Sequence, residues 1–182
     1  MKTYPALTPA LRDFIAEQAM FFVATAPRAD SGHVNLSPKG LDGTFRVLDD
    51  HTVAYLDLGG SGIETQAHIQ ENGRLTLMFC AFQGRANILR LYGRGEVYDF
   101  DHPDWERWRA KFAYRGNARA VIVLRVERIQ DSCGWGVPLY RLEGQREQLP
   151  RWADAKPKGE WESTRRHKNA TSIDGLPGMG GA

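Results

Sequence analysis

The segment TVAYLDLGGSGIETQAHIQENGRLTLMF, residues 52–79, decides the fold. It opens with a run of β-branched and aromatic residues, which is typical of a strand, and this run ends at the turn GGSG, residues 59–62. A helical pattern follows, in which Ile63, Ala67 and Ile69 point inward, and a second apolar run returns. The segment therefore predicts a strand, a glycine-rich turn, one short helix and another strand.

Strand-like segments dominate the chain on both sides of this unit. They cover residues 21–26, 33–37, 44–49, 52–58, 74–82, 88–98 and 120–130. A helix begins near Thr8 and Pro9, and a second interrupting helix carries Trp105, Trp108 and Phe112 at helical spacing. Many short strands with only two interrupting helices favour an antiparallel barrel over repeated strand-helix-strand units. The fold is predicted to be mainly β with flanking helices.

The chain changes character after about residue 131. Two helix-like pieces, residues 145–155 and 159–170, follow a stretch rich in glycine and aromatic residues. The basic residues of this tail, Arg165 among them, alternate with glutamates and predict a solvated helix face. No linker separates a second domain. We expect a domain over residues 1–130 and an extension over 131–182 that packs on the barrel or on a partner subunit.

Composition excludes several classes of protein. The chain has 182 residues, 42% of them hydrophobic and 25% charged, as in globular proteins. A net charge of +2 gives no argument for a nucleic-acid or membrane partner, and no segment has the roughly 20 unbroken apolar residues of a membrane span. Cys80 and Cys133 have no second thiol at metal-ligand spacing, and Cys133 is expected to be buried. These features predict a cytoplasmic protein without a metal site.

The turn GGSG, residues 59–62, has two readings. Free backbone N–H groups and the positive end of a helix dipole meet there, which favours an anion. Ser61 and Glu64 also fit the Ser-x-x-Glu capping box, in which the serine only satisfies its own helix. The capping reading is the more common one for this pattern. The turn is neither a Walker loop nor a dinucleotide fingerprint.

Three more residues have open roles. Lys39 follows Ser37 and a proline at the end of a strand, where a lysine is usually a solvated charge. It becomes a candidate for binding an anion only if it lies near the GGSG turn in space. Arg90 lies within an apolar strand and needs either a carboxylate partner or an anionic ligand. Trp135, between two glycines, is either a lid over a flat aromatic ligand or a packing anchor.

Protein acid–base machinery is not evident in the sequence. The five histidines show no metal spacing, and His68 is expected at the surface or boundary of its helix. No Ser/His/Asp triad or paired carboxylates can be singled out. Any redox chemistry is therefore expected to belong to a bound cofactor.

The order of the segments FFVATA, GHVNLSPKG, residues 52–79 and ILRLYGRGEVY resembles the pyridoxamine 5'-phosphate oxidase-like family of FMN-binding split barrels. The resemblance covers about residues 7–130, and the C-terminal part resembles the extension of a separate branch of that family. It implies a six-stranded antiparallel split β-barrel and a homodimer with FMN at the subunit interface. True oxidases carry Ser-Arg-Lys where this chain has Ser61-Gly62-Ile63, so pyridoxamine phosphate is not predicted as the substrate.

The resemblance also implies roles for particular residues. The candidates on the phosphate side of FMN are Ser37, Lys39, Ser61, Gly62 and Thr65. Asn35 and Leu36 are expected along the isoalloxazine ring, and Arg90 and Trp135 are further cofactor-binding candidates.

The leading hypothesis is an FMN-dependent oxidoreductase that transfers a hydride through flavin N5 to or from a small molecule. The alternatives are a deazaflavin-dependent reductase and a flavin- or haem-binding dimer without turnover. No nucleic acid or membrane is expected as a partner.

Overall fold

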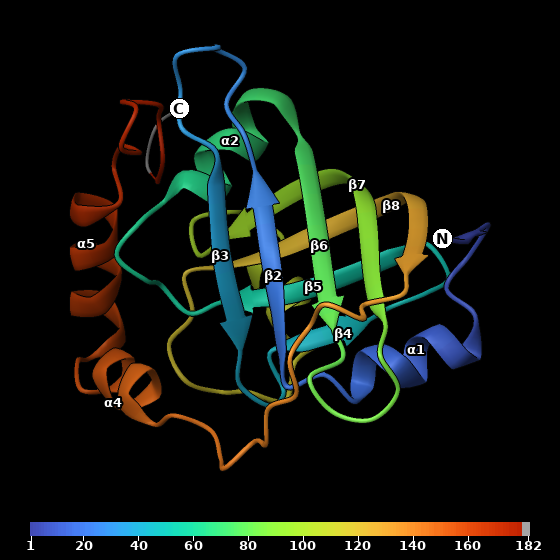
Figure 1. The fold of residues 1–182 in the computed structure, drawn as a ribbon. Coiled ribbons are helices and arrows are strands. Elements are labelled where there is room, and N and C mark those ends of the chain that lie inside the picture. The colour runs from blue at the N-terminus through green and yellow to red at the C-terminus, as the bar shows by residue number, and fades with distance from the viewer. Residues whose placement is uncertain (180–182) are drawn as a thin grey trace.

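The computed structural model describes residues 1–179, and the last three residues of the predicted extension, 180–182, lie outside the described part. The described chain forms eight strands and five helices (Figure 1). The strands are β1 (Thr3–Tyr4), β2 (Met20–Thr25), β3 (Asn35–Gly40), β4 (Phe45–Val47), β5 (Thr52–Asp57), β6 (Arg74–Cys80), β7 (Ile88–Asp99) and β8 (Ala120–Ser132). The helices are α1 (Pro9–Ala16), α2 (Glu64–Asn72), α3 (Trp105–Arg109), α4 (Gln148–Asp154) and α5 (Lys158–Lys168).

All the strands belong to one antiparallel sheet that curls into a split barrel. The strand order is β3-β2-β6-β7-β8-β5-β4, and β1 pairs with β8. The sheet wraps so far that β2, β3 and β6 cross in front of β5 and β8 (Figure 1). The predicted fold class is confirmed. The resemblance implied six strands, which correspond to the six long ones. The strand-like segment 44–49 also predicted β4, so only β1, which has two residues, had no predicted counterpart.

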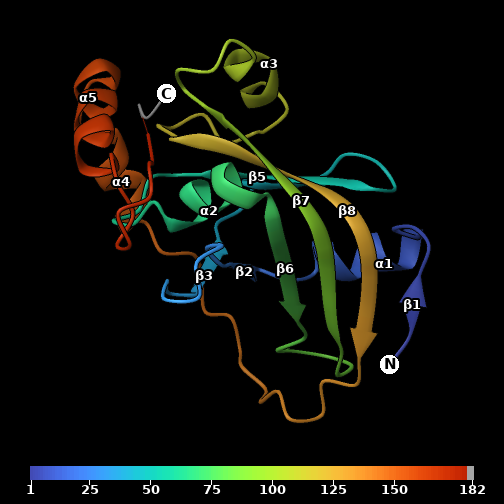
Figure 2. The ribbon, with the colours of Figure 1, turned by 90° about the horizontal axis from the view of Figure 1, so that it is seen from above.

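The barrel interior is filled by one face each of β2, β5, β6, β7 and β8. Because side chains alternate along a strand, Phe21 and Val23 of β2 point inward beside Leu77 and Phe79 of β6. β5 is buried on both faces, since a second apolar cluster that includes Trp105 covers its other side. The helix that carries this tryptophan, α3, lies over β7 and β8 (Figure 2).

The ends of the helices follow from local sequence. Thr8 caps α1 by accepting a hydrogen bond from the N–H of Leu11, as predicted. α2 ends at Gly73, whose φ of 72° is the left-handed conformation that glycine adopts without strain. No described helix is long and apolar enough to cross a membrane.

The C-terminal extension packs against the barrel of its own chain. It leaves β8, runs as an extended segment past the ends of β2 and β3, and returns as α4 and α5, of which α5 lies beside the loop between β5 and α2 (Figures 1 and 2). Asn117 Nδ2 donates to the Ala153 carbonyl of α4 at 2.8 Å, and Arg166 of α5 pairs with Asp101. Cys133, at the start of the extension, is exposed. The expectation that it is buried was wrong, because the chain leaves the sheet just before it.

Candidate functional site

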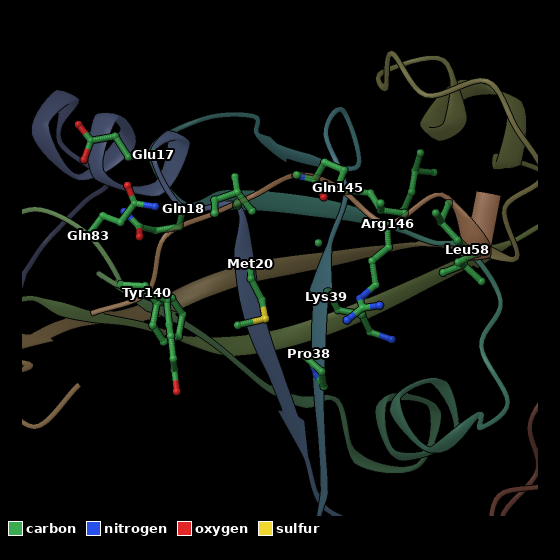
Figure 3. A pocket seen from close by; sticks show the side chains of 18 of the residues that line it. Glu17, Gln18, Met20, Pro38, Lys39, Leu58, Gln83, Tyr140, Gln145 and Arg146 are labelled. Carbon is green, nitrogen blue, oxygen red and sulfur yellow. The ribbon is translucent and has the colours of Figure 1, made fainter. Parts of the chain in front are cut away.

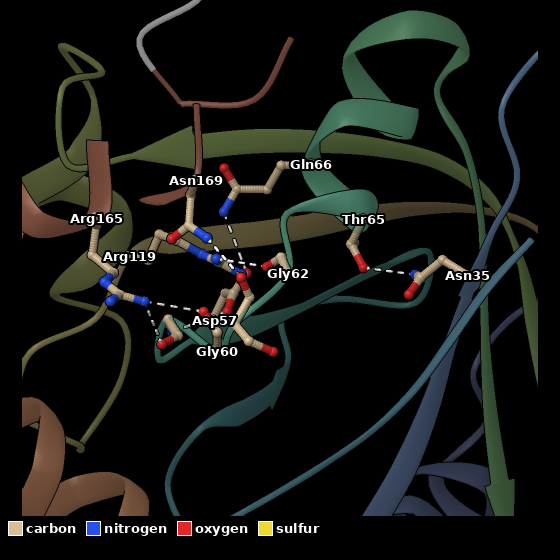
Figure 4. Close-up of polar contacts among 11 residues, drawn as sticks. Asn35, Asp57, Gly60, Gly62, Thr65, Gln66, Arg119, Arg165 and Asn169 are labelled. Carbon is tan, nitrogen blue, oxygen red and sulfur yellow. Dashed lines mark hydrogen bonds and ion pairs between the residues drawn. The ribbon is translucent and has the colours of Figure 1, made fainter. Parts of the chain in front are cut away.

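A buried ion pair lies beneath the glycine-rich turn 59–62. Arg119 Nη2 lies 2.7 Å from Asp57 Oδ2, and Arg119 Nη1 donates to the carbonyl of Gly62 at 2.8 Å (Figure 4). Burial opposes ionisation of Asp57, but the charges of Arg119 and Lys39 outweigh it. The pKa of Asp57 therefore lies well below its usual range, and its charge is retained. The pair fixes the barrel side of the turn.

Helix α5 holds the same turn from the other side. Arg165 Nη1 donates to the carbonyls of Gly59 and Gly60 at 3.3 and 3.1 Å, and Asn169 Nδ2 donates to that of Ser61 at 3.2 Å. The prediction of a solvated basic face was wrong for Arg165, which is buried because its guanidinium binds these carbonyls. Side chains thus bind the carbonyl oxygen of every turn residue.

The backbone N–H groups of the turn, unlike its carbonyls, are mostly without a hydrogen-bond partner in the described chain. The N–H of Gly59 donates to Asp57 at 3.1 Å. The N–H groups of Gly60, Ser61 and Gly62 donate to no residue of the described chain, and these three residues are exposed. Exposed backbone N–H groups without a partner, just before a helix, can donate to an anion.

The capping-box reading of Ser61 and Glu64 was wrong. The N-cap of α2 is Ile63, which makes no side-chain capping bond. The Glu64 carboxylate lies against Gly62 and accepts the N–H of Ile173 at 3.2 Å. Because this carboxylate repels an anion at Gly62, the N–H groups of Gly60 and Ser61 are the better donors.

A chain of side-chain hydrogen bonds joins β3, β2 and α2. Asn35 Nδ2 donates to Thr65 Oγ1 and Thr25 Oγ1, both at 3.0 Å, and Thr25 Oγ1 lies 2.9 Å from His68 Nδ1. The structure therefore places two predicted candidates, Asn35 and Thr65, in direct contact (Figure 4). His68 was expected at the surface or boundary of its helix, but it is fully buried where α2 packs on β2. Burial lowers its pKa, which favours the neutral imidazole.

A cavity of about 1050 Å³ opens beside the turn. It is lined by the ends of β3 and β5, the loops after α1 and β6, and residues 140–149 of the extension (Figure 3). This volume is at the upper end of the range for small-molecule sites. Lys39 and Gly59–Gly60 both line the cavity, so the lysine and the turn do meet in space.

The remaining candidates are distributed over two faces of β3. Asn35, Ser37 and Lys39 share one face, because side chains alternate along a strand. Leu36 points to the opposite face and is 64% exposed. It does not line the cavity.

Arg90 and Trp135 lie away from the turn. Arg90 is on the outer face of the sheet, in register with Met78 of β6, and donates to Ser132 Oγ at 3.1 Å. Its partner within the described chain is thus a hydroxyl and not a carboxylate, and its role as an anion-binding candidate stays a prediction. Trp135 is 86% exposed and contacts no part of the cavity, so within this chain it is neither lid nor anchor.

Sequence reasoning missed the residues that hold the turn in place. Asp57 had a visible signal, since it is the one acidic residue in an otherwise apolar strand. Arg119 directly precedes the apolar run of β8, but nothing local pairs it with Asp57. Arg165 and Asn169 were hidden within a helix of ordinary charged composition. Among the described residues no group of His, Cys, Asp or Glu side chains is arranged to hold a metal ion.

Comparison with known proteins identifies the family. The profile of the family described as pyridoxamine 5'-phosphate oxidase matches residues 7–133. A protein of Aspergillus flavus, the pyridoxamine 5'-phosphate oxidase family protein ustO, is 38% identical over 192 residues, which cover 97% of this chain and 77% of that protein.

Solved structures show the same fold. HupZ of Group A Streptococcus is 26% identical, with a TM-score of 0.55 over 74% of this chain and 98% of that one. A pyridoxamine 5'-phosphate oxidase-related, FMN-binding protein of Nostoc punctiforme is 11% identical, with a TM-score of 0.50 over 70% of this chain and 83% of that one. By its profile match, its sequence identity and its split barrel, this chain belongs to the pyridoxamine 5'-phosphate oxidase family.

Proposed function

We propose that the protein is a homodimeric, FMN-dependent oxidoreductase. The observation that carries this proposal is the exposed glycine-rich turn, where the N–H groups of Gly60 and Ser61 have no partner in the described chain, beside a cavity that Lys39 also lines. Membership of the family supports it, as does the FMN-binding protein of Nostoc punctiforme, which shares the fold.

The donor set fits the phosphate of a flavin nucleotide. A phosphate needs hydrogen-bond donors and positive charge, and the turn supplies N–H groups at the start of a helix of nine residues. Lys39 supplies an ammonium group that has no ion pair in the described chain. Ser37, on the same face of β3, provides a hydroxyl. The pair of Asn35 and Thr65 provides polar atoms beside the helix start.

The residues of this chain act by binding and orienting. When bound, the flavin supplies the redox chemistry by accepting or donating a hydride at N5. Arg119, Arg165 and Asn169 bind the turn carbonyls and so hold its backbone in place, with the N–H groups of Gly60 and Ser61 available to the cofactor. This preorganisation lowers the entropy cost of cofactor binding.

Exposed apolar surface supports the homodimer. Val34 and Leu36 of the β3 region are 73% and 64% exposed, and Trp135 is 86% exposed. Val34 and Leu36, two positions apart in an extended segment, lie on one face, and neighbouring exposed apolar side chains of this kind mark interaction sites. In a dimer these residues, including Trp135, would be available to cover a flavin held by the partner.

The visible absorption spectrum and thermal melting test the proposal. We expect purified protein to show flavin absorption or to melt at a higher temperature with added FMN, because a ligand of the native state stabilises that state. A protein that is colourless and gains no stability from FMN would contradict the proposal. If a deazaflavin alone stabilises the protein, the alternative reductase is correct. Light scattering in solution tests the dimer.

The role of Lys39 is tested separately. Lys39→Ala should weaken FMN binding about tenfold or more, since a hydrogen bond to a charged group contributes roughly 1.5–3 kcal/mol. Riboflavin, which lacks the phosphate, should bind equally to both forms. Lys111→Ala, which removes a charge outside the cavity, is the control. If Lys39→Ala binds FMN as tightly as wild type, Lys39 does not bind the phosphate and is an ordinary solvated charge.

A further inference from the structure

The end of the described chain, residues 169–179, folds back on itself as a small hairpin. An antiparallel bridge between Thr171 and Pro177 closes it, and Ile173 and Asp174 lie between these two residues, near the tip. This C-terminal hairpin lies outside the part of the chain that the family profile matches. Its contacts therefore belong to the extension and not to the common barrel.

The tip of the hairpin binds two segments that are far apart in the sequence. The Asp174 carboxylate accepts the N–H of His33 through Oδ2 and binds His33 Nδ1 through Oδ1, both at 2.7 Å. The Ile173 N–H donates to Glu64 Oε1 at 3.2 Å. His33 lies two residues before β3, in the loop beside the hairpin (Figure 1), and Glu64 is the first residue of α2. The tip thus joins the start of β3 to the start of α2.

The two segments that the tip joins carry the proposed cofactor-binding residues. They are also joined directly, since Asn35 Nδ2 donates to Thr65 Oγ1 at 3.0 Å (Figure 4). Asn35 follows His33 by two positions, and Thr65 follows Glu64 by one. The hairpin therefore adds an outer connection beside the inner one.

The base of the hairpin contacts the glycine-rich turn. Asn169 Nδ2 donates to the carbonyl of Ser61 at 3.2 Å. Gly178 lies so close to Ile63, the N-cap of α2, that an added Cβ would be 2.8 Å from Ile63 Cγ1. Because the hairpin contacts the turn at its base and the start of β3 at its tip, the relative position of these two segments depends on it.

The tip of the hairpin is accessible to solvent. Ile173 is 72% exposed, and the side chain of His33 is 74% exposed. Segments near a chain end that are held by solvent-accessible hydrogen bonds open at a low cost in free energy. The hairpin can therefore open locally while the barrel stays folded.

The strength of the pair at the tip depends on charge. The hydrogen bonds from the N–H and the imidazole of His33 lower the pKa of Asp174, so its carboxylate stays ionised. A protonated imidazole binds a carboxylate more strongly than a neutral one, and histidines gain this proton between about pH 8 and pH 5. The other titratable or charged groups around the pair are His68, Glu64, Glu71, Arg74 and Arg28.

We propose that the C-terminal hairpin is a latch that controls the exchange of the cofactor, with Asp174 as its positioning residue. When closed, the latch holds the start of β3 against the start of α2, so that the residues of both segments bind the cofactor together. When it opens, the two segments separate more readily and the cofactor leaves faster. The proposal rests on the proposed function, in which these two segments bind FMN.

Hydrogen exchange of the flavin-free protein, followed by NMR, tests the latch without any cofactor. The Gly59 N–H reports on the turn, and the Ala67 N–H, bonded to the Ile63 carbonyl at 3.0 Å, reports on the first turn of α2. Asp174→Ala should speed the exchange of both about tenfold, since it removes hydrogen bonds to a charged group. Asp13→Ala, which removes an exposed carboxylate from α1, is the matched control and should exchange like wild type.

The rate of FMN dissociation, measured by the fluorescence of released flavin after dilution, tests the function of the latch. Asp174→Ala should release FMN about tenfold faster than wild type, and Asp174→Asn, which keeps an oxygen for the His33 N–H, should lie between the two. His33→Asn keeps a donor near the position of Nδ1 but cannot be protonated. It should release FMN like wild type at about pH 8 and faster than wild type at about pH 5.5, a difference that a merely structural role of His33 does not produce.

The outcomes separate the latch from the proposed function. Unchanged hydrogen exchange in Asp174→Ala would overturn the latch, and so would faster exchange with an unchanged rate of FMN release. Identical pH profiles of wild type and His33→Asn would overturn the role of charge at the tip. If wild type binds no FMN, the proposed function fails and the cofactor role of the latch fails with it, whereas faster exchange in Asp174→Ala still supports the hairpin as the element that orders the two segments.

Discussion

Replacing Arg119 with methionine tests the buried ion pair beneath the turn. Both side chains of the pair are only 3% exposed. The variant leaves the Asp57 carboxylate buried with the Gly59 N–H and the more distant Gln66 amide as donors, and it also removes the bond to the Gly62 carbonyl. Breaking a buried pair by removing one partner costs about 3–5 kcal/mol, and we expect Arg119→Met to lose this amount of unfolding free energy.

Urea unfolding followed by tryptophan fluorescence measures the loss. With a slope of about 2 kcal/mol per molar urea, the midpoint should fall by on the order of 2 M at unchanged slope. The double variant Asp57→Asn/Arg119→Met should lose less unfolding free energy than the two single variants lose in sum, because it removes both charges. A loss below about 1 kcal/mol in Arg119→Met, or strict additivity, would refute the reasoning.

The same pair predicts a dependence on pH. Folding lowers the pKa of Asp57, so its contribution to stability is complete above the ordinary carboxyl pKa of about 4 and is lost as the pH falls below that value. The stability difference between wild type and Asp57→Asn should therefore shrink between about pH 6 and pH 3. A difference that stays constant over this interval would show that Asp57 is not preferentially ionised in the folded state.

Two further predictions concern glycine and cysteine. Gly93 lies at a bulge between β7 and β8, where an added Cβ would overlap the Arg125 carbonyl. Gly93→Ala should therefore lower the free energy of unfolding, measured in urea, by about 3 kcal/mol. Gly136 has open space around it, so Gly136→Ala should lower this free energy only slightly. A thiol reagent should label exposed Cys133 quickly and buried Cys80, whose pKa burial raises, only on unfolding; fast labelling of both would contradict the described packing.

The sequence predicted the barrel because the signal for it is local. Alternating apolar residues define the strands, and the inward positions Ile63 and Ala67 of α2 followed from helical spacing. The sequence showed that Lys39 could lie near the glycine-rich turn, because neighbouring strand ends come together in such a barrel. It did not establish that the two meet. The expectation that His68 lies at the surface or boundary of α2 was wrong because helix periodicity does not reveal a second packing face.

The anchors of the turn could not be predicted for a different reason. Arg165 reaches carbonyls far away in the sequence, and its neighbours are ordinary charged residues of a helix. Arg146 lies in an irregular segment, residues 139–147, whose position depends on the hydrogen bond from Gln145 to Asp42. Contacts of this kind are set by tertiary packing and have no periodic pattern.

The position of β3 at the end of the sheet has a consequence for solubility. An edge strand offers unpaired backbone groups to other chains and is a template for aggregation. In the described chain β3 pairs only with β2. Pro38 removes one backbone donor from the strand, and the charge of Lys39 opposes close stacking of copies. The residues that end the strand at the site therefore also protect it from uncontrolled strand addition, and replacing Pro38 with valine would favour fibrous assembly.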